Sequence, residues 1–432
     1  GYGGRRMTLT IFLVVLMGSI LLGLPVSFAL LLSSMALMFH MDLFSADILS
    51  NALINGVDSF TLLAIPFFLV AGEVMSVGGL SMRIVRLANA FVGHRKGGLG
   101  YVAILTSILL AGLSGSAVAD AAALVSILYP MMRDAKYPEG SSIGLLASGG
   151  IIAPVIPPSI PLILIGVAGG ISIKNLFIGG IVPGLIMGLT LLFLWYFLVR
   201  KESLPVEKKA SAKERLAALK DGIWALFLPF IILGGIRFGI FTPTEAAVVA
   251  AVYAILVSVF IYRELTFRKL YLVLGRAGRS TAMVMFLVGC AMVAAWLITV
   301  AQLPQQLAQL LEPLIDSPRL LMAVIMLLVF LVGMVMDLSP TILILVPLLM
   351  PVVKMAGIDP VYFGLMFVIN TSIGLITPPV GNVLNVVCGV SRVPMSAAIK
   401  GIMPFIGAYV LLLILFIVFP SIITVPMKLI IG

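Results

Sequence analysis

The chain has 432 residues, of which 62% are hydrophobic and only 10% are charged. Soluble globular proteins average about 45–50% apolar and about 25% charged residues, so this composition excludes a soluble enzyme, a zinc-finger protein and a disordered regulator. At roughly 20 apolar residues for each spanning helix, the length allows about ten to twelve membrane spans. The net charge of +10 indicates an excess of Lys and Arg in cytoplasmic loops rather than binding to nucleic acid.

Cysteine and histidine residues are too few and too scattered to suggest a metal enzyme. Cys290 and Cys388 lie far apart in apolar runs, which is typical of small buried residues. His40 and His94 have no Glu or second His at ligand spacing, and the chain has no GxxxxGK[ST] motif for ATP hydrolysis. We therefore expect no enzymatic activity, no organic cofactor and no transition metal. Any work that the protein does must draw on ion gradients or on partners.

The N-terminal part of the chain alternates long apolar runs with amphipathic stretches. The first run is not followed by a small-residue cleavage site, so we predict a span rather than a removable signal peptide. Apolar periodicity and helix breakers divide this part into five elements. They are spans at 8–23 and 25–40, an amphipathic stretch at 43–56, a span at 59–79 and an amphipathic stretch at 81–94.

Two interrupted apolar stretches follow. Residues 98–135 contain a break at Gly112-Leu113-Ser114-Gly115-Ser116. Because one span needs only about 20 residues, we interpret this stretch as two half-length helices that form a re-entrant hairpin. Residues 142–170 form a predicted span that is broken by several prolines, and residues 175–199 form the last span of this unit.

The second half of the chain repeats the first at a shift of about 221 residues, which places Pro157-Pro158 on Pro378-Pro379 and Ser116 on Asp337. Matching prolines are informative because proline fixes φ and removes a hydrogen-bond donor. We predict a first repeat at 7–200, a cytoplasmic linker helix at 201–221 and a second repeat at 222–424. The second repeat contains an amphipathic stretch at 265–278, a hairpin at 318–355 and a broken span at 361–391.

The number of crossings sets the relative orientation of the two repeats. Each repeat has five predicted crossings if its hairpin does not cross, so the second repeat must enter the membrane from the opposite face. With the N-terminus outside, most of the 27 Lys and Arg residues fall in inner loops and in the linker, as the positive-inside rule requires. The predicted fold class is an all-α polytopic membrane protein with two inverted-topology repeats, re-entrant helical hairpins and broken helices.

The four interruptions form two corresponding pairs, the hairpin tips at 112–117 and 333–340 and the interrupted spans at 149–159 and 372–382. Breaks inside spans can be simple kinks or close-packing devices. They also free carbonyls that can coordinate Na⁺ and expose helix N-termini that favour an anion. Because the interruptions correspond between the two predicted repeats, we favour an ion and substrate site over simple kinks. The hydroxyl and amide side chains at these breaks are Ser114, Ser116, Ser159, Ser339, Thr341, Ser372, Thr377 and Asn382.

Four carboxylates lie in apolar stretches, where a charge is usually paired, ion-bound or functional. Asp337 is the strongest functional candidate because it lies in a hairpin tip. Asp120 lies one turn beyond the other tip, and either binds an ion or attaches the hairpin to a neighbouring helix. Glu245 follows a helix-start signal, which favours a first-turn carboxylate. For Glu73, structural and functional interpretations both remain open.

Several motifs together resemble the large membrane subunit of tripartite ATP-independent periplasmic (TRAP) transporters. They are GLSGSAVADAAAL at 112–124, SGGIIAPVIPPSIPLILIG at 148–166, FTPTEAAVVAAVYA at 241–254, MDLSPTILILVPLLMPV at 336–352 and TSIGLITPPVGNVLNV at 371–386. The resemblance covers essentially the whole chain. It is strongest for the sialic acid members, followed by the C4-dicarboxylate members.

The resemblance implies a Na⁺-coupled importer of an organic acid, with two or more Na⁺ ions and an elevator-type motion. The expected partners are a small four-helix membrane subunit, a periplasmic substrate-binding protein and membrane lipid. The expected location is the bacterial inner membrane, with a periplasmic N-terminus. A stand-alone Na⁺/anion symporter that needs no binding protein is the alternative.

The resemblance also assigns residues to two Na⁺ sites. The first would use Ser114, Ser116, Gly149, Ile152 and Pro154, mostly through carbonyl groups. The second would use Gly333, Asp337, Gly374 and Thr377. We expect the substrate to lie near Ser159, Ser339, Thr341 and Asn382.

Overall fold

The computed structural model describes residues 2–431, and every regular element in this range is helical. The first half contains α1 (Tyr2–Leu21), α2 (Val26–His40), α3 (Ala46–Val57), a 3-10 turn (Phe60–Leu63), α4 (Ala64–Val77), α5 (Leu80–Val92), α6 (Gly98–Ser114), α7 (Ala117–Asp134), α8 (Glu139–Gly150), α9 (Ile160–Gly169) and α10 (Ile173–Val199).

The second half begins with α11 (Ala212–Arg237), α12 (Pro243–Leu256) and a π turn (Val257–Ile261). It continues with α13 (Phe267–Val300), α14 (Leu303–Ile315), α15 (Pro318–Gly333), α16 (Leu338–Met355), α17 (Pro360–Gly374), α18 (Asn382–Ser391), α19 (Met395–Val418) and α20 (Ser421–Ile431). The all-helical class is confirmed, and helices end within each of the four predicted interruptions.

Within residues 2–431, seven helices are long and apolar enough to cross a membrane. They include α10, α11, α13 and α19, together with the helices that begin at Phe60, Pro243 and Leu338. Other apolar helices are shorter, among them α6, α9, α15, α17 and α18, which are halves of the predicted hairpins and broken spans. Since α16 is itself long enough to span, length alone does not distinguish a re-entrant hairpin from a crossing.

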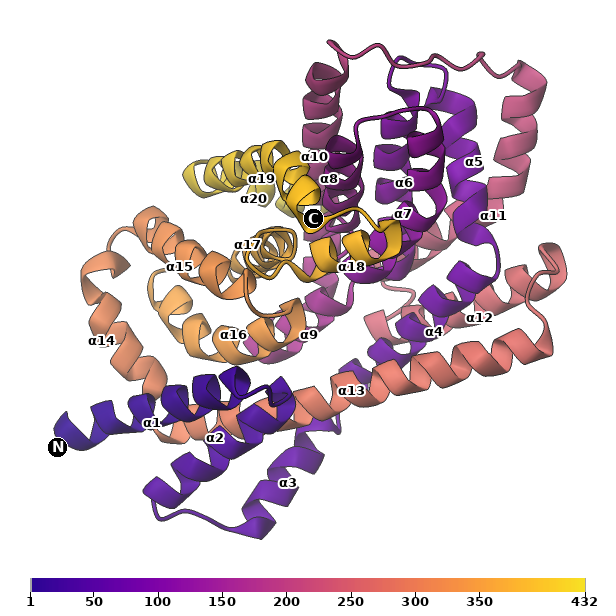
Figure 1. Ribbon diagram of the computed structural model, residues 1–432. Helices are drawn as coiled ribbons and strands as arrows, with labels where there is room; N and C mark the ends of the chain where they lie inside the picture. The colour runs from indigo at the N-terminus through magenta and orange to yellow at the C-terminus, as the bar shows by residue number, and fades with distance from the viewer. Residues whose placement is uncertain (1, 432) are drawn as a thin grey trace.

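Two predicted boundaries differ from the structure. The linker helix expected at 201–221 begins only at Ala212 and continues without interruption into the following span, whereas residues 203–211 are not helical. Ser211 and Glu214 form a capping box that starts α11, and Pro205 disfavours helix just before it. The amphipathic stretch expected at 265–278 is the first part of the single long helix α13, which runs along the lower side of the molecule in Figure 1.

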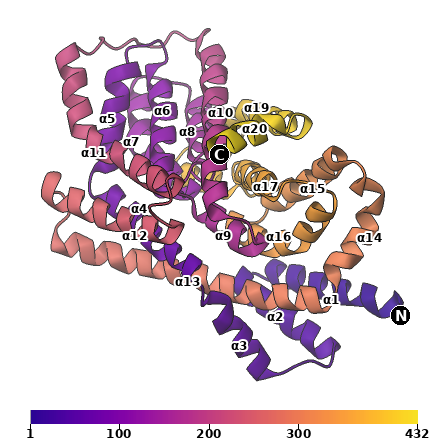
Figure 2. The same ribbon diagram turned by 180° about the vertical axis from the view of Figure 1, so that it is seen from behind.

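Helices that the predicted repeat pairs make matching contacts across the two halves. Helix α7 packs on α18, and α16, which the prediction pairs with α7, packs on α9. Likewise α8 packs on α19, and α17, which the prediction pairs with α8, packs on α10. Figures 1 and 2 show these helices gathered in the middle of the molecule, with α13 and α2 to one side. The broken spans therefore lie where both halves interlock.

Close packing at this centre depends on glycine. The crossing of α8 and α19 brings Gly140 against Gly401, with backbone contacting backbone. Tyr409 on α19 donates a hydrogen bond of 2.9 Å to the carbonyl of Ser148 on α8. On the other side, Gly180 and Gly184 of α10 pack against the first break. Small residues at such crossings let helices approach closely, which is how membrane helices commonly associate.

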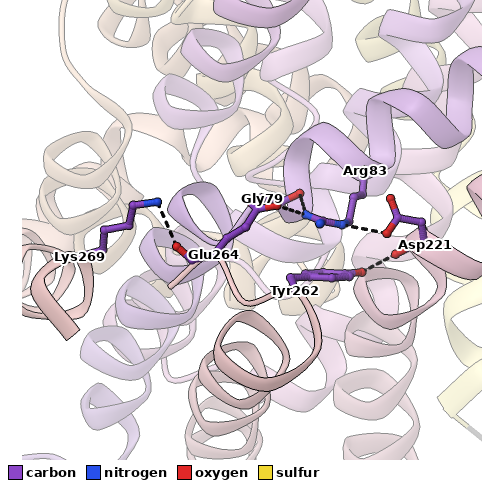
Figure 3. Close-up of polar contacts among 6 residues, drawn as sticks. All are labelled: Gly79, Arg83, Asp221, Tyr262, Glu264 and Lys269. Atoms are coloured by element: carbon purple, nitrogen blue, oxygen red, sulfur yellow. Dashed lines mark hydrogen bonds and ion pairs between the residues drawn. The ribbon is translucent and has the colours of Figure 1, made fainter. Parts of the chain in front are cut away.

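Arg83 joins its own helix, α5, to two segments of the second half (Figure 3). Its guanidinium forms ion pairs with Asp221 at 3.0 Å and with Glu264 at 2.7 Å. It also stacks on the ring of Tyr262 at 3.8 Å and donates to the carbonyl of Gly79 at 2.9 Å. The Arg83 side chain is 14% exposed. This cluster therefore connects α5 of the first half to α11 and to the segment between the π turn and α13 in the second half.

Replacing Arg83 by alanine is expected to lower the apparent melting temperature of the purified protein. The change leaves two carboxylates without their partner, but both are more than two-fifths exposed, so we expect a loss of about 1–2 kcal/mol. Arg86→Ala, an exposed position on the same helix, is the control and should melt like the parent. Equal melting of the two variants would contradict a role for the cluster in joining the halves.

Candidate functional site

The tip of the first hairpin is a two-residue interruption between α6 and α7. Gly115 has φ +63°, a conformation that favours glycine. Ser116 caps α7 by accepting a hydrogen bond from the Ala119 amide at 3.3 Å. A Cβ on Gly115 would lie 2.9 Å from Cα of Ser159, and it would also meet the carbonyl of Pro158. The tip therefore packs directly on the first broken span.

The first broken span is fully buried. Every residue from 142 to 166 is inaccessible to solvent or nearly so, as expected for non-helical backbone enclosed by protein. Ser159 crosses the break, because its hydroxyl donates to the carbonyl of Pro154 at 2.5 Å and accepts from the Leu162 amide at 3.3 Å. Ser159 thereby caps α9 and fixes the path of the break.

The carbonyls predicted for the first Na⁺ site are engaged in local hydrogen bonds. The Gly149 carbonyl accepts from the Ile152 amide at 3.2 Å, and the Pro154 carbonyl accepts from Ser159. The Ile152 carbonyl accepts two amides, those of Val155 at 3.0 Å and Ile156 at 3.2 Å. A carbonyl oxygen has two lone pairs. A cation at Ile152 would therefore have to displace one of these hydrogen bonds, and the assignment of the site stays a prediction.

The second hairpin tip also meets its broken span. A Cβ on Gly374 would lie 2.6 Å from the carbonyl carbon and oxygen of Gly333. Thr377 donates to the carbonyl of Ile373 at 2.7 Å, and its own amide donates to the carbonyl of Gly374 at 3.0 Å. Three of the four residues predicted for the second Na⁺ site are thus brought together. The break is less enclosed than the first, because Pro379 is exposed.

The Asp337 side chain forms no hydrogen bond with that group. Its side chain is exposed and forms no hydrogen bond or ion pair with any other residue between 2 and 431. Only its backbone carbonyl is engaged, accepting from the Thr341 hydroxyl at 2.7 Å. The structure therefore places Asp337 at the hairpin tip, as predicted, with a carboxylate that is free in this conformation.

The four residues predicted near the substrate have different surroundings. Ser159 and Thr341 are buried. The Ser159 hydroxyl bridges the first break, and the Thr341 hydroxyl donates to the Asp337 carbonyl in the second hairpin tip. Ser339 and Asn382 are half-buried at the starts of α16 and α18. Asn370, which was not singled out in the sequence, is fully buried on α17 and donates to the carbonyl of Met326 at 2.6 Å. In the sequence, Asn370 could have been recognised because Asn370-Thr371-Ser372 is a run of polar residues within an apolar helix.

The remaining carboxylates fall into two classes. Glu245 forms a capping box with Thr242, with hydrogen bonds of 2.8 and 3.2 Å, so the predicted first-turn role is confirmed. Glu73 and Asp120 instead line one cavity of about 300 Å³ between the first hairpin and α4. Other polar groups in its wall are Ser76, Ser81, Ser114, Ser116 and Ser280.

Comparison with known proteins identifies the family. Residues 13–422 match the family model described as the tripartite ATP-independent periplasmic transporter, DctM component. The chain is 56% identical over 422 residues to the 2,3-diketo-L-gulonate TRAP transporter large permease protein YiaN of Escherichia coli, covering 98% of this chain and 99% of that protein. This match does not support the expectation that the sialic acid members resemble the chain most strongly.

More distant relatives carry other substrate names. Identity is 38% to the sialic acid TRAP transporter large permease protein SiaM of Vibrio cholerae, covering 94% of this chain and 95% of that protein. It is 40% to the C4-dicarboxylate protein DctM of Pseudomonas aeruginosa, covering 84% and 86%.

Among solved structures, the YdaH transporter of Alcanivorax borkumensis has a similar fold. Its TM-score is 0.64 at 16% identity, and the match covers 88% of this chain and 91% of that one. At this level of identity the likeness concerns the fold alone. The family match and the relatives agree over nearly the whole chain, so this protein belongs to the DctM family of TRAP transporter large permeases and is a transporter subunit, not an enzyme.

Proposed function

We propose that this permease imports a sugar acid of the 2,3-diketo-L-gulonate type, in symport with Na⁺. The observation that carries the substrate class is the 56% identity over nearly the full length to the protein named for that compound. The relatives named for sialic acid and C4-dicarboxylates are 38% and 40% identical. Sialic acid and C4-dicarboxylates are therefore the comparison substrates.

Na⁺ coupling is supported by the two contacts between a hairpin tip and a break. In each half, a glycine of the tip lies against a broken span: Gly115 lies against Ser159, and Gly333 lies against Gly374. Broken helices of this kind in secondary transporters coordinate Na⁺ through backbone carbonyls and face anionic substrates with half-helix N-termini. Gly333, Gly374 and Thr377 are the residues that we assign to the second Na⁺ site.

An elevator motion of two inverted repeats is the second part of the proposal. It is supported by the order of elements, because α6 to α10 and α15 to α19 follow one another with similar lengths, and by the matching contacts between the halves. In this scheme the hairpins and broken spans move together against α2, α4, α11, α12 and α13. The long helix α13 provides a continuous surface for that movement.

The TRAP assignment implies two partners, a small membrane subunit and a periplasmic binding protein. It also implies the bacterial inner membrane as the location. We further propose a periplasmic N-terminus, on the basis of the Lys and Arg excess in the loops that would then face the cytoplasm. The chain is rich in exposed apolar side chains, such as Phe193, Phe230 and Phe267, which membrane lipid or the small subunit can cover.

The test is uptake by proteoliposomes that contain the complex of large and small subunits. Labelled 2,3-diketo-L-gulonate should accumulate only when Na⁺ and the cognate binding protein are both present on the same side. Excess unlabelled sialic acid or succinate should not compete. Uptake without the binding protein would favour a stand-alone symporter, and preferential uptake of sialic acid or succinate would contradict the substrate class.

A further inference from the structure

An apolar cavity of about 200 Å³ lies beside the first hairpin and the first broken span. Its wall combines residues of α6, of the break between α8 and α9, of α10 and of α11. Gly112 contributes from the last turn of α6, Pro157 from the break and Pro229 from α11. None of the described residues that line the cavity has a polar side chain. An apolar cavity of this kind does not hold water.

Close packing around this cavity keeps its wall from collapsing. A Cβ on Gly184 would overlap the side chain of Ile156, and a Cβ on Gly188 would overlap that of Ile108. Both isoleucines line the cavity and lie directly against the backbone of α10, so they cannot turn inward without giving up these contacts. The ring of Pro229, which cannot rotate away, adds another fixed part of the wall. The space is therefore filled only by a molecule from outside the chain.

The cavity opens toward the bilayer. Leu185 on α10 is 43% exposed and Phe230 on α11 is 74% exposed, and both line the cavity. Ala225, at 0%, and Ile156, at 7%, form its enclosed part. Both helices are long and apolar enough to span a membrane, and Leu185 lies near the middle of α10. The mouth of the cavity therefore lies near the centre of the hydrocarbon layer, where the ends of lipid acyl chains meet.

The surface around the mouth is apolar in both directions. Leu189 is 60% exposed one turn further along α10, and Phe227 is 46% exposed one turn before Phe230 on α11. A smaller cavity of about 150 Å³ with a similar lining binds benzene, so this one has room for the last few methylene groups of one chain. An α-helix, about 10 Å across, is too wide to enter it. Size, chemistry and position therefore all fit a single acyl chain.

We propose that the end of a phospholipid acyl chain occupies this cavity and joins the first hairpin and the first broken span to α11. The chain supplies contacts that an empty cavity lacks, because each wall atom gains dispersion attraction from the carbons beside it. In the elevator motion proposed above, α6, the break and α10 move against α11. The chain end lies between the moving part and the stationary part, and it must leave when these walls separate. Its binding in the present conformation does not depend on that motion.

The test is photo-cross-linking in proteoliposomes that contain the complex of large and small subunits. The probe is phosphatidylethanolamine with a diazirine group at the end of one acyl chain, and tandem mass spectrometry locates the labelled residues. We expect label on Ile156 and Ala225, which lipid on the outer surface cannot reach, as well as on the exposed ring of Phe227. Label on Phe227 without label on Ile156 or Ala225 would overturn the proposal.

Two matched variants on α10 separate the cavity from general contact with lipid. Leu185→Trp adds bulk at the mouth, so label on the two enclosed residues should fall at least fivefold relative to label on Phe227. Leu189→Trp adds the same bulk one turn further along the helix, outside the cavity, and should keep that ratio within twofold of the parent. Ile181→Phe, at another position in the wall, replaces Leu185→Trp if that variant does not fold.

Equal labelling of the enclosed residues in the variant that blocks the cavity and in Leu189→Trp would overturn the proposal. Na⁺-independent uptake by the parent protein would instead overturn the proposed function and would leave the expected labelling unchanged.

Discussion

Replacing Gly401 by alanine is expected to prevent most of the protein from folding to its native form. A Cβ on Gly401 would overlap the backbone carbonyl of Gly140, where α19 crosses α8. Backbone atoms cannot move aside by changing a rotamer, so the two helices must separate. We expect a loss of about 3 kcal/mol or more, at the upper end of overpacking effects. The measurement is the fraction of monodisperse protein after purification, together with its apparent melting temperature.

The control lies on the same helix. A Cβ on Gly407 would have no neighbouring atom within 4 Å, and alanine is a better helix former than glycine by about 1 kcal/mol. Gly407→Ala should therefore fold at least as well as the parent protein. A Gly401→Ala variant as stable as Gly407→Ala would show that the crossing of α8 and α19 is looser than described.

The second large effect is expected where Gly374 of the second broken span contacts Gly333 of the second hairpin tip. Gly374→Ala should reduce Na⁺-dependent uptake at least tenfold, because its Cβ would lie 2.6 Å from the Gly333 carbonyl and would push the tip away from the broken span. The neighbouring groups of Thr377 and Gly333, which we assign to the second Na⁺ site, would then lose their spacing. Uptake at several Na⁺ concentrations measures the effect.

Gly333→Ala is the matched control for that change. A Cβ on Gly333 would lie 3.4 Å from Cα of Thr371, an ordinary van der Waals distance, so uptake should stay within threefold of the parent. The contact should therefore tolerate a methyl group on Gly333 and not on Gly374. Equal loss in the two variants, or full activity in Gly374→Ala, would contradict the described contact.

Much of the fold could be predicted because the residues that end its helices act through their own conformational preferences. Gly115 and Ser116 interrupt α6 and α7 by their own conformational preferences, and the prolines after residue 153 do the same between α8 and α9. Such effects act over a few residues and can be deduced without tertiary structure.

One of the two errors in the predicted helices, the end expected at residue 278, lies where segments that the predicted repeat pairs differ in sequence. The first half breaks at Asp58, which ends α3. The equivalent position is Arg279, and α13 passes through it without interruption. Arginine is a good helix former and aspartate is a poor one. The repeat pattern predicts that the two segments are related, but the continuity of each one depends on such single positions.

The parts of the site that the sequence could not predict depend on where side chains point in the folded protein. The sequence places Asp337 in a hairpin tip, but it does not indicate that this carboxylate is exposed while the Gly333 backbone beside it is packed on Gly374. Nor does it indicate that Asp120 shares a cavity with Glu73, which lies on a different helix. The motifs favoured the sialic acid members, whereas identity over nearly the whole chain is higher to the relative named for 2,3-diketo-L-gulonate than to the relative named for sialic acid.

The most direct test of Na⁺ coupling is the reversal of net substrate flux in proteoliposomes with imposed Na⁺ gradients and membrane potentials. If both hairpin tips bind Na⁺, the gradient that stops net flux of 2,3-diketo-L-gulonate should correspond to at least two Na⁺ ions for each substrate molecule. A reversal point that does not change with the Na⁺ gradient would contradict the account.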